Sequence, residues 1–228
     1  PAGWGGLCGA LGPDKPGVLI DDTTNVSYAG GAYGLEGDPA LTENSNLTPD
    51  SLLTFGDLEW SNLVDLRDIT IPGGTTMTQL EPDSILAGGS YTCRRDLLNN
   101  WGDPGNPSGV CGSYFPIIYA AGNLSISASD LGQGILLVEG NLSVQGGHEF
   151  FGPVIVRGEL KTTGTGGHFN GGVIAANVNL DSSTVLGDAL VQYSQCAVTR
   201  AVLNNANLTR VRPLEDRSWV DLSSVISG

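Results

Sequence analysis

A repeat of 18 residues in the second half of the chain constrains the fold more than any other feature. Four similar segments begin at residues 118, 136, 154 and 172, and a weaker fifth begins at residue 190. A unit of this length is too short to bury its own apolar face, so successive copies must stack on one another. The repeat therefore predicts a solenoid.

Each copy alternates apolar and other residues in two short runs, which is the pattern of β-strands with one buried face. A small residue separates the runs and would let the chain turn a corner; these residues are Gly122, Gly140, Gly158 and Ala176. We predict an all-β fold, a single-stranded parallel β-helix with 18-residue rungs, in which a right-handed coil is favoured and loops such as residues 145–150 complete each rung. One inward column should then consist of Leu124, Leu142, Leu160 and Val178.

The period divides the chain into three parts. Residues 116–198 carry the rungs. Residues 1–115 lack the period and are rich in turn dipeptides, so we predict an irregular cap and flanking loops with one short helix, and a candidate early rung at residues 17–20 and 25–27. Residues 199–228 should form a C-terminal cap, because an exposed β-helix end invites pairing with other chains.

An apolar stripe also faces outward from the predicted rungs, formed by Tyr119, Leu137, Ile155 and Val173. Leaving such side chains in water would cost roughly 1.5 to 3 kcal/mol each, so something should cover them. The chain's own helices are one candidate cover, with helical patterns at residues 51–66 and 197–205. The alternative is another subunit, which makes these four residues a candidate interface.

Charge and hydropathy narrow the set of partners. The formal net charge of −14 disfavours nucleic acids and anionic membrane surfaces. No run of about 18 apolar residues occurs, so we expect no membrane insertion within the numbered chain. Because the chain opens at Pro1, we expect it to be processed or truncated, with any amino-terminal membrane segment removed or omitted. The remaining partners are proteins, including a second copy.

The four cysteines are dispersed and lack the spacing of a zinc site or a thioredoxin-like pair. Disulfides are therefore expected, and three pairings are formally available. We favour Cys93 with Cys111, because that bond would close the Gly- and Pro-rich loop at residues 99–107. Cys8 would then pair with Cys196. Disulfides predict an extracellular or cell-surface location.

Several segments are similar to those of a known bacterial group; they lie at residues 134–140, 152–158, 172–178, 193–197 and 217–219. Over residues 90 to 222 the chain resembles the extracellular or periplasmic region of PilX-like proteins, which are associated with type IV pili. The resemblance implies a bacterial surface location and association with a pilus. It brings no catalytic residues.

Candidates for bound ions are few. His148 and His168 each follow a Gly-Gly pair, and a displacement of one rung could bring them near Glu149. A metal site needs three or four ligands at fixed distances, so we expect these residues to cap the rungs and predict no metal. Calcium is the one cofactor for which oxygen-rich runs exist, at residues 21–25 and 99–103. Neither run has EF-hand spacing, and the turn chemistry of Asn and Asp accounts for both.

No nucleophile elbow, phosphate loop or dinucleotide motif occurs in the sequence, and we predict no catalytic residue. The outward Glu139 and Arg157 lie one rung apart and should form a surface ion pair. We therefore predict a non-catalytic extracellular structural or interaction protein, a candidate for a pilus-associated or filament-forming subunit. The alternative is a carbohydrate-binding or polysaccharide-cleaving β-helix, which would need carboxylates gathered on an outer face.

Overall fold

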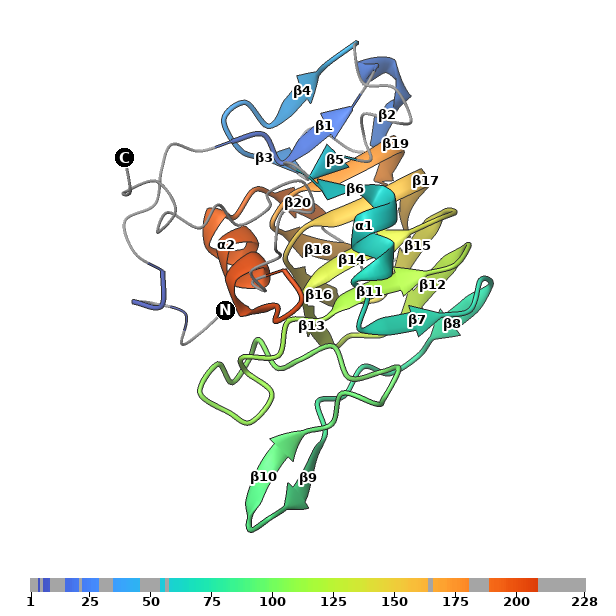
Figure 1. Ribbon diagram of the computed structural model, residues 1–228. Helices are drawn as coiled ribbons and strands as arrows, with labels where there is room; N and C mark the ends of the chain where they lie inside the picture. Colours follow the sequence, from blue (N-terminus) through green and yellow to red (C-terminus); the bar gives the residue numbers. More distant parts are fainter. Residues whose placement is uncertain are drawn as a thin grey trace, which may run out of the picture.

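The computed structural model shows a parallel β-solenoid of about seven turns with two short helices. It describes Trp4 and residues 6–8, 15–20, 22–28, 35–45, 54–55, 58–163, 166–180 and 189–208. Figure 1 shows the rungs stacked along one direction, with the helices against the outside of the stack and a hairpin extending beyond one end. The predicted fold class is thereby confirmed.

Three parallel stacks of strands form the walls of the solenoid. The first stack has the order β4 (Leu41–Glu43), β1 (Val18–Ile20), β19 (Val173–Leu180), β17 (Val154–Thr163), β14 (Ile135–Val138), β11 (Ile117–Ala120) and β7 (Ile69–Ile71). The second joins β8 (Thr75–Met77), β12 (Leu124–Ser127), β15 (Leu142–Gln145), the ends of β17 and β19, and β2 (Val26–Tyr28). The third has the order β13 (Leu131–Gln133), β16 (His148–Phe151), β18 (Gly167–Asn170), β20 (Leu190–Gln192) and β3 (Leu35–Glu36).

The predicted stacking of Leu124, Leu142, Leu160 and Val178 is present in the strand register. Leu124 pairs with Leu142, Leu142 with Leu160, and Leu160 with Val178. The glycine corners also stack, since Gly140 N–H donates to the Gly122 carbonyl at 3.2 Å and Gly158 N–H to the Gly140 carbonyl at 3.1 Å. The 18-residue period is therefore one turn of the solenoid.

The rungs differ from the prediction in having a third strand. Residues 148–151, within and just after the predicted return loop, form β16, in which His148 and Phe150 are buried and Glu149 lies between them at the surface. This alternation is the same strand pattern that identified the other two walls. The alternation in β16 covers only four residues and follows a Gly-Gly pair, so the sequence pattern predicts a loop for most of this segment.

The solenoid also includes strands that precede the predicted boundary at residue 116, and they lie at both of its ends. At one end, β7 and β8 lie under β11 and β12. At the other end, the predicted early rung is found as β1 and β2, but both stack on β19, so the first strands of the chain follow the last rung in space. The apolar alternation of Val18 and Ile20 fits an interior position, yet nothing local specifies which rung it joins. The remainder of the proposed C-terminal cap, residues 209–228, lies outside the described part.

Two apolar clusters hold the solenoid together. The first fills the interior and contains the inward residues of all three walls, with Trp101 at one end. The second lies outside the first wall, where Tyr119, Leu137 and Ile155 face α1 (Trp60–Asp65) and α2 (Gln195–Asn204). Trp4 completes this cover. The chain's own helices therefore cover the outward stripe.

The prediction for one stripe residue, Val173, is wrong. Ile155 pairs with Ile174, 19 residues later, so Val173 faces the interior and Ile174 takes the outward position. A shift of one residue moves a side chain to the other face of a strand. The spacing of 19 means that one residue is added before β19. An irregularity in β17 between Val156 and Glu159 compensates for it, so Glu159 again pairs with Asn177, 18 residues later.

The first helix is shorter than the pattern at residues 51–66 suggested. Strands β5 (Thr54–Phe55) and β6 (Leu58–Glu59) precede it, and α1 has six residues. The second helix matches its prediction closely and begins after Ser194, whose hydroxyl accepts the Ala197 N–H at 3.3 Å. None of the helices in the described ranges is long and apolar enough to cross a bilayer.

Candidate functional site

An insertion between β8 and β11 provides the clearest candidate for a functional surface. We call residues 81–115 the arm; it contains the antiparallel hairpin of β9 (Ser84–Ala87) and β10 (Ser90–Cys93). The hairpin extends away from the solenoid beside β7 and β8 (Figure 1). Gly88 and Gly89 form its turn with φ of 60° and 86°, a pair of conformations that glycine adopts without strain and that matches the strand twist.

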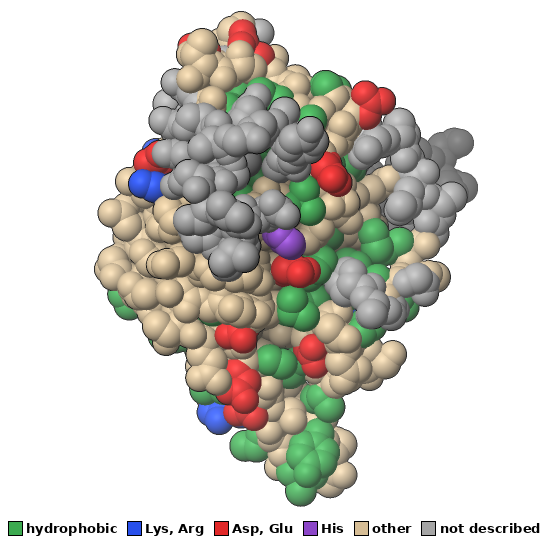
Figure 2. Space-filling view, turned by 180° about the vertical axis from the view of Figure 1, so that it is seen from behind, with side chains coloured by type: hydrophobic (Ala, Val, Ile, Leu, Met, Phe, Trp, Pro, Cys, Tyr) green, Lys and Arg blue, Asp and Glu red, His purple; other side chains and the backbone are tan. Residues whose placement is uncertain are grey.

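Among the described residues, the exposed large apolar side chains are concentrated in the arm. Ile85, Leu86 and Tyr91 are 53%, 60% and 63% exposed, and Leu98 and Val110 lie near the base of the hairpin. Only two other large hydrophobic residues in the described ranges, Leu7 and Leu203, are comparably exposed. Figure 2 shows hydrophobic side chains at the lower tip and acidic ones on the surface above it. Clustering of this kind marks interaction surfaces.

The hairpin strands have unpaired outer edges. Each pairs only with the other among the described residues. Arg94 N–H donates to the Asp83 carbonyl at 2.9 Å, so antiparallel alternation makes Leu86 and Tyr91 a pair whose backbone groups point outward. No charged residue occurs from Ser84 to Cys93, although the chain carries a net charge of −14. The hairpin thus lacks the charges that usually protect edge strands.

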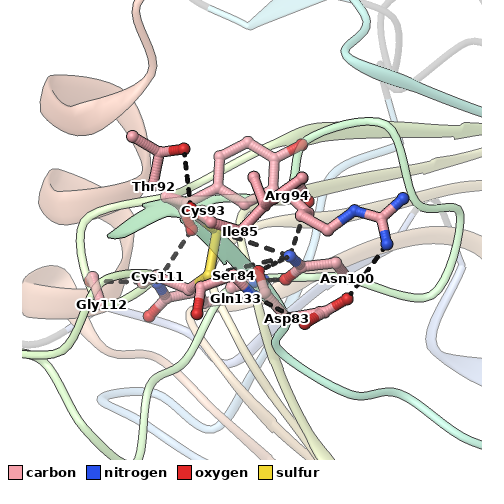
Figure 3. Close-up of a disulfide and its surroundings, with 12 residues drawn as sticks. Asp83, Ser84, Ile85, Thr92, Cys93, Arg94, Asn100, Cys111, Gly112 and Gln133 are labelled. Carbon is pink, nitrogen blue, oxygen red and sulfur yellow. Dashed lines mark hydrogen bonds and ion pairs between the residues drawn. A yellow bond between two sulfur atoms is a disulfide. The ribbon is translucent and has the colours of Figure 1, made fainter. Parts of the chain in front are cut away.

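A disulfide and a buried amide fix the base of the hairpin (Figure 3). Cys93 is bonded to Cys111, with the Cα atoms 5.0 Å apart. The side-chain amide of Asn100 donates to the carbonyls of Arg94 at 2.7 Å and Asp83 at 3.1 Å, and its oxygen accepts the Gly102 N–H at 3.2 Å. Because Asn100 is fully buried, these bonds replace the water that its amide would otherwise need. The two strands are therefore held from below.

A second amide joins the arm to the solenoid. Gln133, buried in β13, donates from its side-chain nitrogen to the carbonyls of Tyr114 at 2.9 Å and Gly112 at 3.1 Å. The backbone of Gln133 donates to Trp101 at 2.8 Å, and the Trp101 ring lies edge-on to Phe150 inside the solenoid. Trp101 therefore lies next to β13, where the third strand of a preceding rung would otherwise pair. The arm is rigidly attached at its base and open at its tip.

Ion pairs join the charged residues next to the hairpin. Arg94 contacts Asp96 at 2.6 Å and Asp83 at 3.3 Å. The hydrogen bond from Arg94 lowers the pKa of Asp96, and the same bond raises the pKa of Arg94. All three side chains are partly exposed, so the pairs define local geometry more than stability.

The candidate metal ligands are divided between two faces of the third wall. His148 is buried, and its Nδ1 lies 2.7 Å from the Asp130 carbonyl. Glu149 and His168 face outward and contact each other at 3.7 Å. No group of three potential ligands is found in the described ranges. The structure therefore does not bring these three residues to one point.

Burial changes the chemistry of His148. Desolvation lowers its pKa to about 4, against a smaller opposing effect of the hydrogen bond to Asp130. A carbonyl can only accept, so Nδ1 carries the hydrogen and Nε2 is bare. Nε2 is buried without a hydrogen-bond partner, and the ring lies edge-on to Trp101 at 6.0 Å. His148 is a neutral residue of the core.

The oxygen-rich runs serve local turns. Asp22 accepts from the backbone and side chain of Thr24 at 2.8 and 2.7 Å, which lowers the pKa of Asp22 and starts the short 3-10 helix at Thr23–Asn25. In the second run, Asn100 holds the arm and Asp103 accepts from the Asn106 N–H at 3.1 Å. Asp21 lies outside the described part. Calcium binding at either run stays a prediction.

The outward stripe ends in a small polar cluster. Arg157 forms the expected ion pair with Glu139, which also accepts from the Trp60 indole at 3.1 Å and the Tyr119 hydroxyl at 3.5 Å. Burial, and then Glu139, raise the pKa of Tyr119. Leu137 and Ile155 are buried within the chain itself. The cluster lies at the edge of α1. The candidate interface residues make their contacts within the chain itself.

Both expected disulfides are present. Cys8 is bonded to Cys196 at the start of α2, and Cys93 to Cys111. The first bond holds the amino-terminal segment against α2, where Trp4 stacks on the Arg200 guanidinium at 4.2 Å. Two disulfides indicate a non-reducing, extracellular-type environment.

A polar groove of about 710 Å³ lies at the corner between the second and third walls. It is lined by Thr78, Gln79, Ser127, Ala128, Ser129, Asp130, Gln145 and Gly146. Asp130 is the one charged residue of this lining, and its carboxylate accepts the Leu80 N–H at 2.8 Å. Hydroxyl, amide and carboxylate groups of this kind bind polyhydroxylated ligands by hydrogen bonds.

Comparisons of the chain with protein-family models, with curated proteins and with solved structures returned no significant match. The fold and the arm therefore have to be interpreted from their own geometry. Sequence reasoning missed Ile85, Leu86 and Tyr91, although a signal was present. A Gly-Gly pair between two short β-prone runs is typical of a hairpin with a two-residue turn.

Proposed function

We propose that this chain is a non-catalytic structural and interaction module of the extracellular space, and that it presents the arm to a protein partner. The observation that carries the proposal is an uncharged hairpin with three large apolar side chains at least half exposed. Exposing such a hairpin is costly for a soluble protein, because apolar surface is wetted and strand edges are open. A partner that covers both would remove that cost.

The attachment of the arm supports the same proposal. Cys93–Cys111, Asn100 and Gln133 fix its base to the solenoid, so the tip is presented in a defined orientation. A preorganised element loses less conformational entropy on binding than a flexible loop. The resemblance of several segments to PilX-like proteins makes a pilus-associated or filamentous assembly the proposed setting.

Site-specific photo-crosslinking in cells that secrete the protein tests the proposal. Benzoylphenylalanine replaces Tyr91 at the tip or, as the matched control, Leu203, which is 66% exposed on α2. Protein adducts are expected from position 91, reduced by a second change, Leu86→Asp, and absent from position 203. Equal crosslinking from both positions, or none from position 91, would contradict the proposal.

The polar groove supports a second candidate, the binding of neutral glycans. Its lining offers hydroxyls and amides from successive rungs, and a single carboxylate. Most glycoside hydrolysis needs two carboxylates, so binding fits this lining better than cleavage. Calorimetric titration with neutral oligosaccharides tests it, with Gln145→Ala in the groove compared with Gln192→Ala outside it. Loss of heat of binding in the first variant alone would favour this candidate.

A further inference from the structure

We propose that the partner of the arm is a second copy of this chain, and that two copies pair antiparallel through the outer edges of β10 about a twofold axis. This inference rests on the proposed function and makes it specific. Identical strands in antiparallel orientation are self-complementary, so such a contact is isologous and closes on two copies. The contact would form one four-stranded sheet from two hairpins.

The two edges of the hairpin are not equivalent. Backbone groups point outward at Leu86 and Ser84 on the β9 side, but the next outward position is Pro82, which has no N–H. On the β10 side the outward positions are Tyr91, Cys93 and Arg95, and each of these has a donor. Proline blunts an edge strand, so β9 is the protected edge and β10 the available one.

Pairing at this edge also joins the apolar faces. Only residues whose backbone groups point outward can form the new ladder, so Tyr91 would lie opposite Tyr91 or Cys93 of the second copy. Leu86 and Tyr91 are directly paired within each hairpin and share a face. The same face of both hairpins would then form one continuous apolar surface.

Charge favours the tip of the hairpin for such a meeting. The chain carries −14, so most approaches of two copies bring like charges together. The hairpin from Ser84 to Cys93 is uncharged and extends away from the body (Figure 1). Repulsion between the bodies is screened by salt, so this contact should strengthen as ionic strength rises. A basic partner would show the opposite dependence.

Unpaired backbone groups argue against a lipid surface as the occupant. A bilayer core offers no donors or acceptors to the edge of β10, and unsatisfied groups there cost several kcal/mol each. The contact area is small, because a ten-residue hairpin cannot supply the roughly 1,200 Å² typical of stable complexes. The dimer should therefore be weak and populated at high local concentration.

Sedimentation equilibrium of the purified chain at low and high salt tests the inference, with two matched variants. Tyr91→Pro removes an outward N–H from the β10 edge, and Leu86→Pro makes the same change on the β9 edge. We expect a reversible dimer that strengthens with salt, a dissociation constant raised about tenfold or more by Tyr91→Pro, and a change under about threefold with Leu86→Pro. Unchanged thermal melting and an intact Cys93–Cys111 bond show that both variants keep the fold.

Other outcomes overturn the inference. They are a monomer at every concentration and salt, a dimer that both variants weaken equally, or co-sedimentation with phosphatidylcholine vesicles that Tyr91→Pro abolishes. Crosslinking from position 91 in cells to a different protein, with a monomeric purified chain, would overturn the second copy as partner and leave the proposed function standing. Failure of both experiments would reject the two together.

Discussion

The solenoid body and the arm are both built from short β-strands, but they differ in how those strands are paired and buried. In the body, the strands between the two ends of each stack are paired on both sides and bury one face in the interior, as in β14, which lies between β11 and β17. In the arm, two strands pair only with each other and most of their side chains are exposed. Order in the body comes from repetition, whereas order in the arm comes from a covalent bond and buried amides at its base. The difference teaches that strands of the same kind can bury apolar side chains in the body and leave them exposed, with open edges, in the arm.

Removing a core side chain should separate the two regions most sharply. Leu142 is fully buried in the central column, and Leu142→Ala is expected to lower the free energy of unfolding by about 2 to 5 kcal/mol, through lost apolar burial and a cavity. Leu86→Ala in the arm should change it by less than about 0.5 kcal/mol, because Leu86 is exposed. Chemical denaturation measures both. A similar loss in the two variants would show that the arm belongs to the cooperative core.

Removing the arm disulfide should affect one region only. In the chain-entropy model, closing a loop of about 15 residues contributes roughly 3 kcal/mol, and Cys93 and Cys111 are 18 residues apart. The double change Cys93→Ser and Cys111→Ser is therefore expected to open residues 81–115 locally by about that amount. Hydrogen exchange should become faster in the arm and stay slow in β14 and β15.

A control defines what would contradict this separation. Cys8→Ser with Cys196→Ser removes the other disulfide, which joins the amino-terminal segment to α2. Trp4 and Arg200 donate to the carbonyls of Pro104 at 2.9 Å and Gly112 at 3.3 Å, so this change reaches the arm only in residues that follow the hairpin. Exchange in β9 and β10 should then be unchanged. Faster exchange throughout the solenoid in the arm variant would mean that the arm holds the first rung together through Trp101.

The two regions also differ in how far the sequence could predict them. The 18-residue period predicted the column of Leu124, Leu142 and Leu160, because repetition specifies register directly. Where one residue is added before β19, the same period misplaced Val173, since a single shift exchanges the two faces of a strand.

The sequence predicted the long-range Cys8–Cys196 bond, but it could not predict where the first strands of the chain stack. The apolar pattern of β1 identified a strand, but its stacking on β19 depends on contacts about 155 residues apart in sequence. In the arm, the disulfide was predicted, and the Gly-Gly pair between β9 and β10 could also have indicated the hairpin. The burial of Asn100 and Gln133 as hydrogen-bonding anchors has no periodic signature, because each satisfies carbonyls that the loop happens to present.

Acid should weaken the body through His148. The neutral ring is preferred in the fold, so its pKa falls to about 4, whereas in the unfolded chain it is near the ordinary value of about 6.5. The unfolded state therefore binds more protons as pH falls through this window, and stability decreases. We expect a loss of roughly 2 kcal/mol between about pH 7 and pH 5, measured by urea denaturation.

Two variants isolate this effect. His148→Leu should flatten the dependence above pH 5, while His168→Asn, on the outer face of the adjacent strand, should leave it in place. The arm contains no histidine, so exchange in the hairpin should not follow this profile. A slope that persists in His148→Leu would assign the pH dependence to other groups.

The smallest effect concerns the corners of the body, where side chains protect backbone groups that the arm leaves open. Asn123 Oδ1 accepts the Asn141 N–H at 2.9 Å, and Asn141 Oδ1 accepts the Glu159 N–H at 2.9 Å, so each corner is tied to the next rung. Asn141→Ala should cost about 1 kcal/mol, because one bond is lost where water can partly replace it. Ser143→Ala, two residues along the outer face, should be nearly neutral by thermal denaturation. An equal and negligible effect of both changes would mean that the glycine corners hold the rungs in register without the asparagines. The body would then tolerate open backbone groups as well as the edge of β10 does.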